Sequence, residues 1–183
     1  GTIETCSIQG FLIYVSALTA CLYYCSLSVY SYTGILCNFD QSAIDSLKFV
    51  IHLCVHIYPL ASGMYLLYGE LFNNTGFGYC FIEADPIGCG RSTDVPCKRG
   101  IPVYHNNHRM MVEELFWYIP LWVALVGSTG VMITLYFKVR IGQDKILIPA
   151  RSLALQSLYY LLLFYVGVIP SLFIETAWWV KEL

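Results

Sequence analysis

The residues with the clearest chemical potential in this chain are its eight cysteines. Cys80, Cys89 and Cys97 lie in one long polar stretch, and Cys6 lies at the start of an apolar segment. All four can reach the same oxidising side of a membrane, which is enough for two disulfide bonds. We expect the pairs Cys6–Cys80 and Cys89–Cys97, with metal binding or free thiols as the alternatives.

Two further pairs of residues have a spacing that could hold a metal ion. Cys21 and Cys25, and likewise His52 and His56, are four residues apart, so each pair shares one helix face. The apolar segments offer no carboxylate or third histidine to complete a site. We therefore expect packing residues, with no metal and no cofactor. Hydrolase and phosphate-loop motifs are also missing from the sequence, so no enzyme is expected.

Long apolar segments must position these cysteines. The chain is 57% hydrophobic and 12% charged, about half the charged fraction of a soluble domain. Its net charge of −2 and the lack of a basic face give no reason to expect a nucleic-acid partner. Each apolar segment approaches or exceeds the ~20 residues that cross a bilayer. We predict an all-α membrane protein with four transmembrane helices, spanning about residues 3–33, 47–68, 115–137 and 152–174.

The first of these segments, 3–36, is rich in serine, threonine and tyrosine, which marks helix–helix contact and predicts a central position. A Ser-x-x-Asp capping box, Ser42 to Asp45, is expected to open the second helix. Loops 37–46 and 138–151 are predicted to lie inside the cell and loop 69–114 outside. Disulfide chemistry and the glycosylation sequon at Asn73 favour the outside for the long loop. Basic residues near membrane ends favour the inside for 138–151: Lys138, Arg140, Lys145 and Arg151.

Three prolines interrupt the predicted spans, and each should bend its helix. Pro59, Pro120 and Pro170 all fall in the middle or outer half of the bilayer under the predicted orientation. Bends at a shared depth could open an outward-facing ligand pocket below Cys80. The alternative is that these are tolerated kinks around a filled core. The candidate pocket residues are Gln9, Tyr14, Trp117, Trp122 and Tyr165.

The chain resembles helices three to six of a seven-helix receptor. The first helix is similar to the third helix of cAMP-receptor-like and family-2-like (secretin-like) G-protein-coupled receptors, most of all the divergent receptors of diatoms and other algae. The long loop after the second predicted helix, 69–114, is similar to the corresponding loop of these receptors as well. The stretches that carry the resemblance are Cys6-Ser7-Ile8-Gln9-Gly10-Phe11, Leu22-Tyr23-Tyr24, Leu27-Ser28-Val29-Tyr30, Tyr79-Cys80-Phe81-Ile82, Pro86-Ile87-Gly88-Cys89 and Cys97-Lys98-Arg99-Gly100.

This resemblance implies a plasma-membrane receptor that binds an extracellular ligand and contacts a heterotrimeric G protein through the 138–151 loop. It also implies that the chain is the central part of a longer protein, a 1–183 portion of a seven-helix domain. Where many such receptors carry an Asp-Arg-Tyr-like triad, this chain reads Tyr30-Ser31-Tyr32, without arginine. The rival interpretations are a transporter or channel fragment, and a four-span adhesion or scaffold protein.

Overall fold

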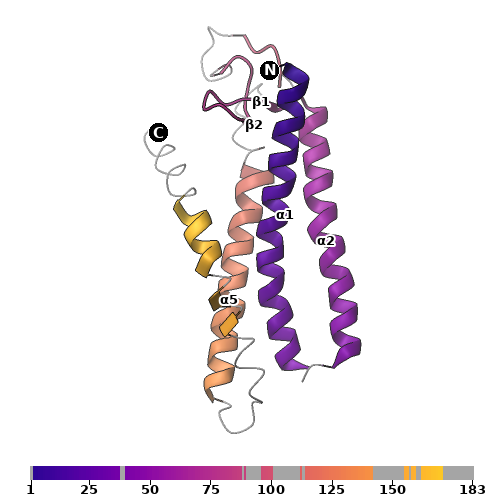
Figure 1. Cartoon of the computed structure of the whole chain (residues 1–183), viewed down its shortest axis with the longest axis vertical. Helices are drawn as coiled ribbons and strands as arrows, with labels where there is room; N and C mark the ends of the chain where they lie inside the picture. Colours follow the sequence, from indigo (N-terminus) through magenta and orange to yellow (C-terminus); the bar gives the residue numbers. More distant parts are fainter. Residues whose placement is uncertain are drawn as a thin grey trace. The chain divides into compact units, whose positions relative to one another are not determined.

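The computed structural model describes residues 2–37, 40–87, 89, 96–100, 112, 114–141, 155–156, 158–159 and 162–170. Within these residues the long helices are α1 (Ile3–Leu36), α2 (Gln41–Tyr68) and α5 (Ile119–Ile141), as Figure 1 shows. A short π-helix, η1 (Glu114–Tyr118), leads into α5. Strands β1 (Phe72–Asn74) and β2 (Cys80–Ile82) form a two-stranded antiparallel sheet. The described part of the chain is therefore mostly helical.

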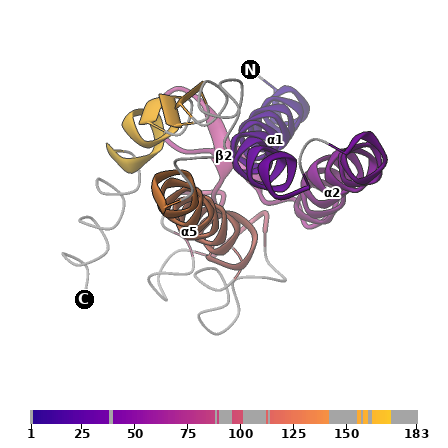
Figure 2. The same ribbon diagram turned by 90° about the horizontal axis from the view of Figure 1, so that it is seen from below.

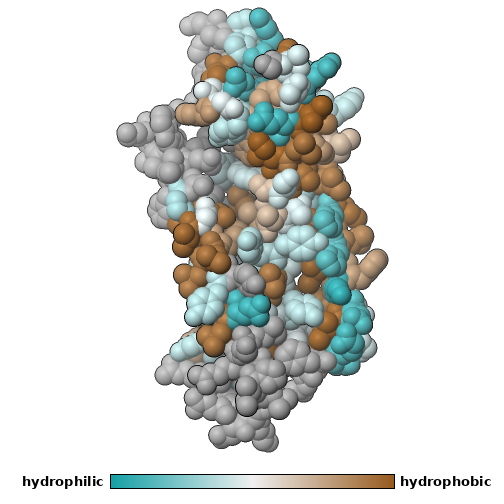
Figure 3. All heavy atoms as spheres, in the orientation of Figure 1, coloured by the Kyte–Doolittle hydropathy of each residue, from teal (hydrophilic) through white to brown (hydrophobic). Residues whose placement is uncertain are grey.

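Three helices are long and apolar enough to cross a membrane: Ile3–Leu36, Ile44–Tyr68 and Leu115–Lys138. They coincide with the first three predicted spans. The fourth predicted span, 152–174, lies partly outside the described residues, and its described part 162–170 is helical. At most 28% of each apolar window is buried, and Figure 3 shows hydrophobic side chains over much of the described surface. Apolar helix surface on this scale is typical of helices that meet lipid or further helices.

The contacts divide the chain into two compact units. The first, which we call the hairpin unit, comprises Gly1–Leu22 and His52–Val123. The second comprises Tyr23–Ile51 and Ala124–Leu183. In the hairpin unit, the first half of α1 lies beside the last half of α2, with the β-hairpin against the start of α1 (Figures 1 and 2). This unit contains both disulfide bonds.

The core of the hairpin unit is built around Tyr14, whose side chain is fully buried. Its hydroxyl oxygen is within hydrogen-bond distance of Ser62 Oγ on α2, at 3.0 Å, and of the Phe116 carbonyl of η1, at 2.8 Å. Its ring lies 5.9 Å from the ring of Phe72 and 5.7 Å from that of Trp117, centroid to centroid. One side chain thus joins α1 to α2, to the hairpin and to η1.

Two glycines allow this close packing. A Cβ built at Gly10 of α1 would meet Cβ of Phe72 at 2.9 Å, closer than real Cβ atoms come. A Cβ at Gly63 of α2 would meet Val15 Cγ2 at 2.9 Å. Small residues let helix backbones approach in this way. The first glycine therefore fixes how closely the hairpin approaches α1, and the second how closely α2 does.

The helix ends differ in places from the sequence predictions. α2 begins at Gln41 and is capped by Asp40, whose carboxylate accepts from Ser42 N and Ser42 Oγ at 3.3 and 3.0 Å. The predicted capping box is therefore wrong, because the helix starts two residues earlier than it requires. The two loops predicted to lie inside the cell are shorter than expected. The loop predicted over 37–46 is limited to 37–40 between α1 and α2, and the loop predicted to begin at 138 begins only after Ile141, where α5 ends.

Two of the three prolines lie inside described helical segments. Pro59 is buried inside α2, which continues as α-helix to Tyr68. Pro120 is the second residue of α5, just after the point where the π-helix η1 gives way to α-helix. Pro170 is the last described helical residue.

The second unit is held together mainly by contacts of α1 with α5 and with 162–170. Cys25 Sγ lies 3.2 Å from the Ala124 carbonyl, and the ring of Tyr24 lies 5.5 Å from that of Phe164. The hydroxyls of Thr129 and Tyr165 are hydrogen-bonded to each other. Cys25 thus serves as a packing residue, and the described residues hold no cluster of three or more potential metal ligands.

Replacing Gly10 by leucine is expected to lower the melting temperature of the detergent-purified protein, because the new side chain displaces Phe72. Overpacking of this kind costs about 1–3 kcal/mol. The matched control is Gly127→Leu in α5, where a Cβ meets nothing within 4 Å. Equal melting temperatures for the two variants would contradict the close packing of hairpin and helix.

Candidate functional site

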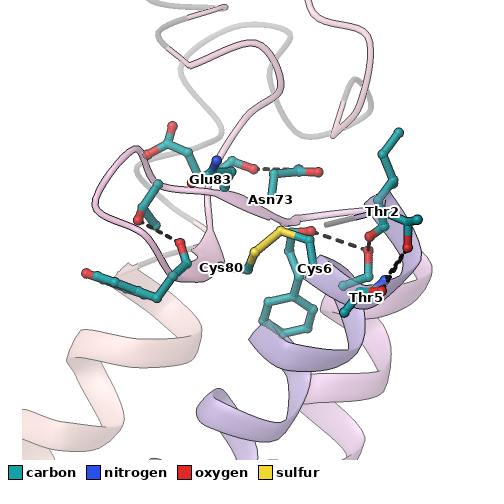
Figure 4. The surroundings of a disulfide bond; sticks show 12 residues. Thr2, Thr5, Cys6, Asn73, Cys80 and Glu83 are labelled. Carbon is teal, nitrogen blue, oxygen red and sulfur yellow. Dashed lines mark hydrogen bonds between the residues drawn. A yellow bond between two sulfur atoms is a disulfide. The ribbon is translucent and has the colours of Figure 1, made fainter.

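A disulfide bond anchors the hairpin to the first turn of α1. Cys6 and Cys80 are 74 residues apart in sequence, and their Cα atoms are 5.4 Å apart (Figure 4). The second predicted bond, Cys89–Cys97, is also present and joins cysteines that are eight positions apart in sequence. In the chain-entropy view, a bond that closes so long a loop as the first stabilises the folded state by about 4 kcal/mol. Both predicted disulfide pairings are therefore seen in the structure.

The hairpin has a tight and fully bonded turn. Phe72 pairs with Ile82 and Asn74 with Cys80 across the two strands. Thr75 donates from both its backbone N and its Oγ1 to the Tyr79 carbonyl, at 3.2 and 2.9 Å. Gly76 and Gly78 take positive φ angles of 84° and 86°, which residues other than glycine rarely adopt. This turn fixes the register that puts Cys80 opposite Cys6.

Asn73, the predicted glycosylation site, is a structural residue of the hairpin. Its side chain is 4% exposed. Its Nδ2 donates to the carbonyls of Glu70 and Glu83 at 2.9 and 2.7 Å, bridging the two ends of the hairpin (Figure 4). A glycan would have to be attached to this same buried nitrogen, so the folded geometry works against glycosylation here.

A charged cluster fixes the base of the hairpin. α2 ends with paired bonds from Glu70 N to the Leu67 carbonyl and from Leu71 N to the Leu66 carbonyl, a Schellman-type end. Glu70 takes the left-handed φ of 56° that this end requires, although glycine is usual there. Its carboxylate Oε2 lies 3.5 Å from Arg99 Nε. Arg99 Nη2 in turn donates to Ser7 Oγ on α1 at 3.3 Å.

A cavity of about 300 Å³ lies between the start of α1, the hairpin and the segment that contains Arg99. The disulfide forms part of its wall. Apart from Ile3, Gly78 and the two cysteines, every lining residue has a polar side chain. The lining residues are Thr2, Ile3, Thr5, Cys6, Gln9, Asn73, Asn74, Gly78, Cys80, Asp85 and Arg99.

The structure brings only part of the predicted pocket together. Gln9 lines the cavity beside the disulfide, as predicted. Tyr14 does not line it, because its buried hydroxyl is bonded to α2 and η1. Trp117 packs edge-on against Phe81 in the same filled core. Trp122 is 45% exposed.

The remaining candidate, Tyr165, belongs to the second unit. There it lines an apolar cavity of about 500 Å³ formed by α5 and the fourth helical segment. Of the five predicted pocket residues, the cavity beside the disulfide therefore contains Gln9 alone. Tyr14 is fully buried, and Trp117 is half-buried beside it.

Two of the four predicted G-protein-facing residues, Lys138 and Arg140, lie at the end of α5. Lys138 is still helical, and its Nζ lies 5.6 Å from the ring centroid of Tyr32 near the end of α1. This cation–π contact joins the two helix ends within the second unit. Arg140 is also within α5. Lys145 and Arg151 lie outside the described residues.

Sequence reasoning missed the cavity residues Asp85 and Arg99. They face each other across an isolated antiparallel bridge, where Arg99 N donates to the Asp85 carbonyl at 3.3 Å. A bridge of one residue pair leaves no periodic signal in the sequence. The sequence feature that could have revealed this bridge is the Cys89–Cys97 pair. A bond between these two cysteines draws together the chain on either side of them, where Asp85 and Arg99 lie.

Removing the tether by Cys6→Ser or Cys80→Ser is expected to reduce surface expression and thermal stability strongly, because the hairpin loses its covalent anchor. Either single variant should be as defective as the double variant, since each breaks the same bond. The control is Cys37→Ser, an exposed cysteine outside both disulfides. Wild-type stability of both single variants would show that the tether is not needed.

Searches of protein-family models, of curated proteins and of solved structures found no match to this chain. The function of the chain is therefore inferred below from its own residues and contacts.

Proposed function

We propose that this chain is part of a seven-helix, G-protein-coupled-receptor-like membrane protein that binds an extracellular ligand beside the tethered hairpin. The observation that carries the proposal is the Cys6–Cys80 bond, which anchors a β-hairpin to the first turn of a membrane-length helix and leaves a polar cavity there. A hairpin held in this way forms one wall of a binding site at the membrane surface. Ligand sites are concave and largely preformed, as this one is.

The packing below the cavity offers a way for a bound ligand to act on the helices. The hairpin residues Phe72 and Phe81 both contact Tyr14, and Tyr14 is bonded to α2 and η1. A ligand that displaced the hairpin would therefore change contacts among three helical segments. The π-helical turn at η1 supports this role, because π-turns within helices are frequent at functional sites. Binding that favours one packing over another shifts the population between them.

The proposal places the protein in the plasma membrane with the hairpin outside. Disulfides persist in oxidising compartments, which supports that orientation. The 138–151 loop and the end of α5 would then face the cytoplasm and contact a heterotrimeric G protein. The cation–π contact of Lys138 with Tyr32 lies where an arginine-bearing triad is absent, and it would hold the two helix ends together in the resting state.

Coupling is tested by expressing the full-length protein with sensors that report dissociation of each class of Gα from Gβγ. We expect basal activation of at least one class, and we expect Tyr32→Leu to raise it about two- to fivefold, because a cation–π contact of about 0.5–1 kcal/mol is lost. Tyr30→Leu is the matched control. Absence of any response at matched surface expression, or equal responses of both variants, would contradict the proposal.

A further inference from the structure

The cavity beside the disulfide contains two opposite charges that are not paired with each other. Asp85 and Arg99 both line it. They are bridge partners on adjacent antiparallel segments, so their side chains lie on the same face. Arg99 forms its ion pair with Glu70 instead. Within the described residues, the Asp85 carboxylate has neither a hydrogen bond nor an ion pair.

Arg99 keeps hydrogen-bonding capacity for a ligand. A guanidinium carries five N–H donors, and the contacts to Glu70 and Ser7 involve only Nε and one terminal nitrogen. The Glu70 side chain is 60% exposed, so this pair is a weak one that a ligand carboxylate can join or replace. The bonds from Lys98 N and Arg99 N to the Asp85 carbonyl hold the two backbone segments side by side.

We propose that this cavity binds a small zwitterion, namely a free α-amino acid, with its ammonium group on Asp85 and its carboxylate on Arg99. The inference rests on the proposed receptor function and names the ligand class of that same site. A volume of about 300 Å³ is at the small end for ligand pockets, which favours a compact molecule over a peptide. Gln9, Asn74 and the threonines at the start of α1 supply neutral hydrogen-bonding groups around the two charges.

A metal ion is a poorer occupant of this cavity. Asp85 is the one carboxylate among the described residues that line it, whereas hard cations such as Ca²⁺ take six to eight oxygen ligands. A simple anion would satisfy Arg99 and leave Asp85 unpaired. A simple amine would pair with Asp85 and leave the spare N–H donors of Arg99 unused. A molecule that carries both charges uses both side chains.

The test is calorimetric titration of the full-length protein in lipid nanodiscs with each standard L-amino acid, up to about 10 mM so that millimolar affinities register. We expect at least one amino acid to bind. Its amine analogue without the carboxylate, and its acid analogue without the ammonium group, should both bind about tenfold more weakly or not at all, because each loses a charge-assisted hydrogen bond.

Two variants locate the site. Asp85→Asn is expected to weaken binding about tenfold or more without changing the melting temperature, because the carboxylate has no described partner to lose. Arg99→Lys should also weaken it, since an ammonium cannot grip a carboxylate with two parallel bonds. Lys98→Gln and Glu4→Gln are matched controls outside the cavity lining and should leave affinity unchanged.

Failure of the ligand assignment is distinct from failure of the receptor proposal. The assignment is overturned if no amino acid binds, if singly charged analogues bind as tightly, or if Asp85→Asn binds like the parent. The comparison with singly charged analogues uses the unmodified protein, so it tests the amino-acid assignment even if a variant does not fold. Gα activation without amino-acid binding would overturn the ligand alone, and amino-acid binding without Gα activation would overturn the receptor function alone.

Discussion

The structure of the hairpin unit depends on one covalent constraint, the bond between Cys6 and Cys80. The hairpin strands are three residues long, and a two-stranded sheet of that size is only marginally stable alone. The disulfide holds it against α1, and Gly10 lets it approach closely enough for Phe72 to reach the buried Tyr14. The cavity exists because the hairpin is held in that place.

Hydrogen bonds from polar side chains then fix the hairpin in the position against α1 that the disulfide gives it. Asn73 bridges the two ends of the hairpin, and Arg99 joins its base to α1 through Ser7. Buried polar side chains are stabilising only when their hydrogen bonds are satisfied, which is the case for Asn73. The two opposite charges on the cavity wall contrast with this arrangement, because Asp85 has no such partner among the described residues. That contrast is the reason to assign the cavity to a ligand.

Much of the helical architecture could be predicted from the sequence, because membrane spans need long apolar segments and disulfides need an oxidising side. The first three spans follow from the first constraint, and the second selects the four cysteines that form the disulfide bonds. Tyr14 was misassigned because a tyrosine in a span fits a pocket wall and a filled core equally well, and only its partners Ser62 and Phe116 decide between them. Asp85 and Arg99 meet through a single bridge, which no local pattern reveals. Asn73 carries a sequon, yet its burial is a tertiary property.

In the orientation that we propose, the hairpin end of the chain faces the outside of the cell and the end of α1 faces the cytoplasm. The most direct test is labelling of intact cells with a membrane-impermeant maleimide, followed by mass spectrometry to identify the modified cysteine. Cys37 is free and exposed at the end of α1, and a cysteine introduced by Lys98→Cys marks the hairpin end. The account predicts that the introduced cysteine reacts in intact cells and that Cys37 reacts only after permeabilisation. Labelling of Cys37 in intact cells, with protection of the introduced cysteine, would contradict it.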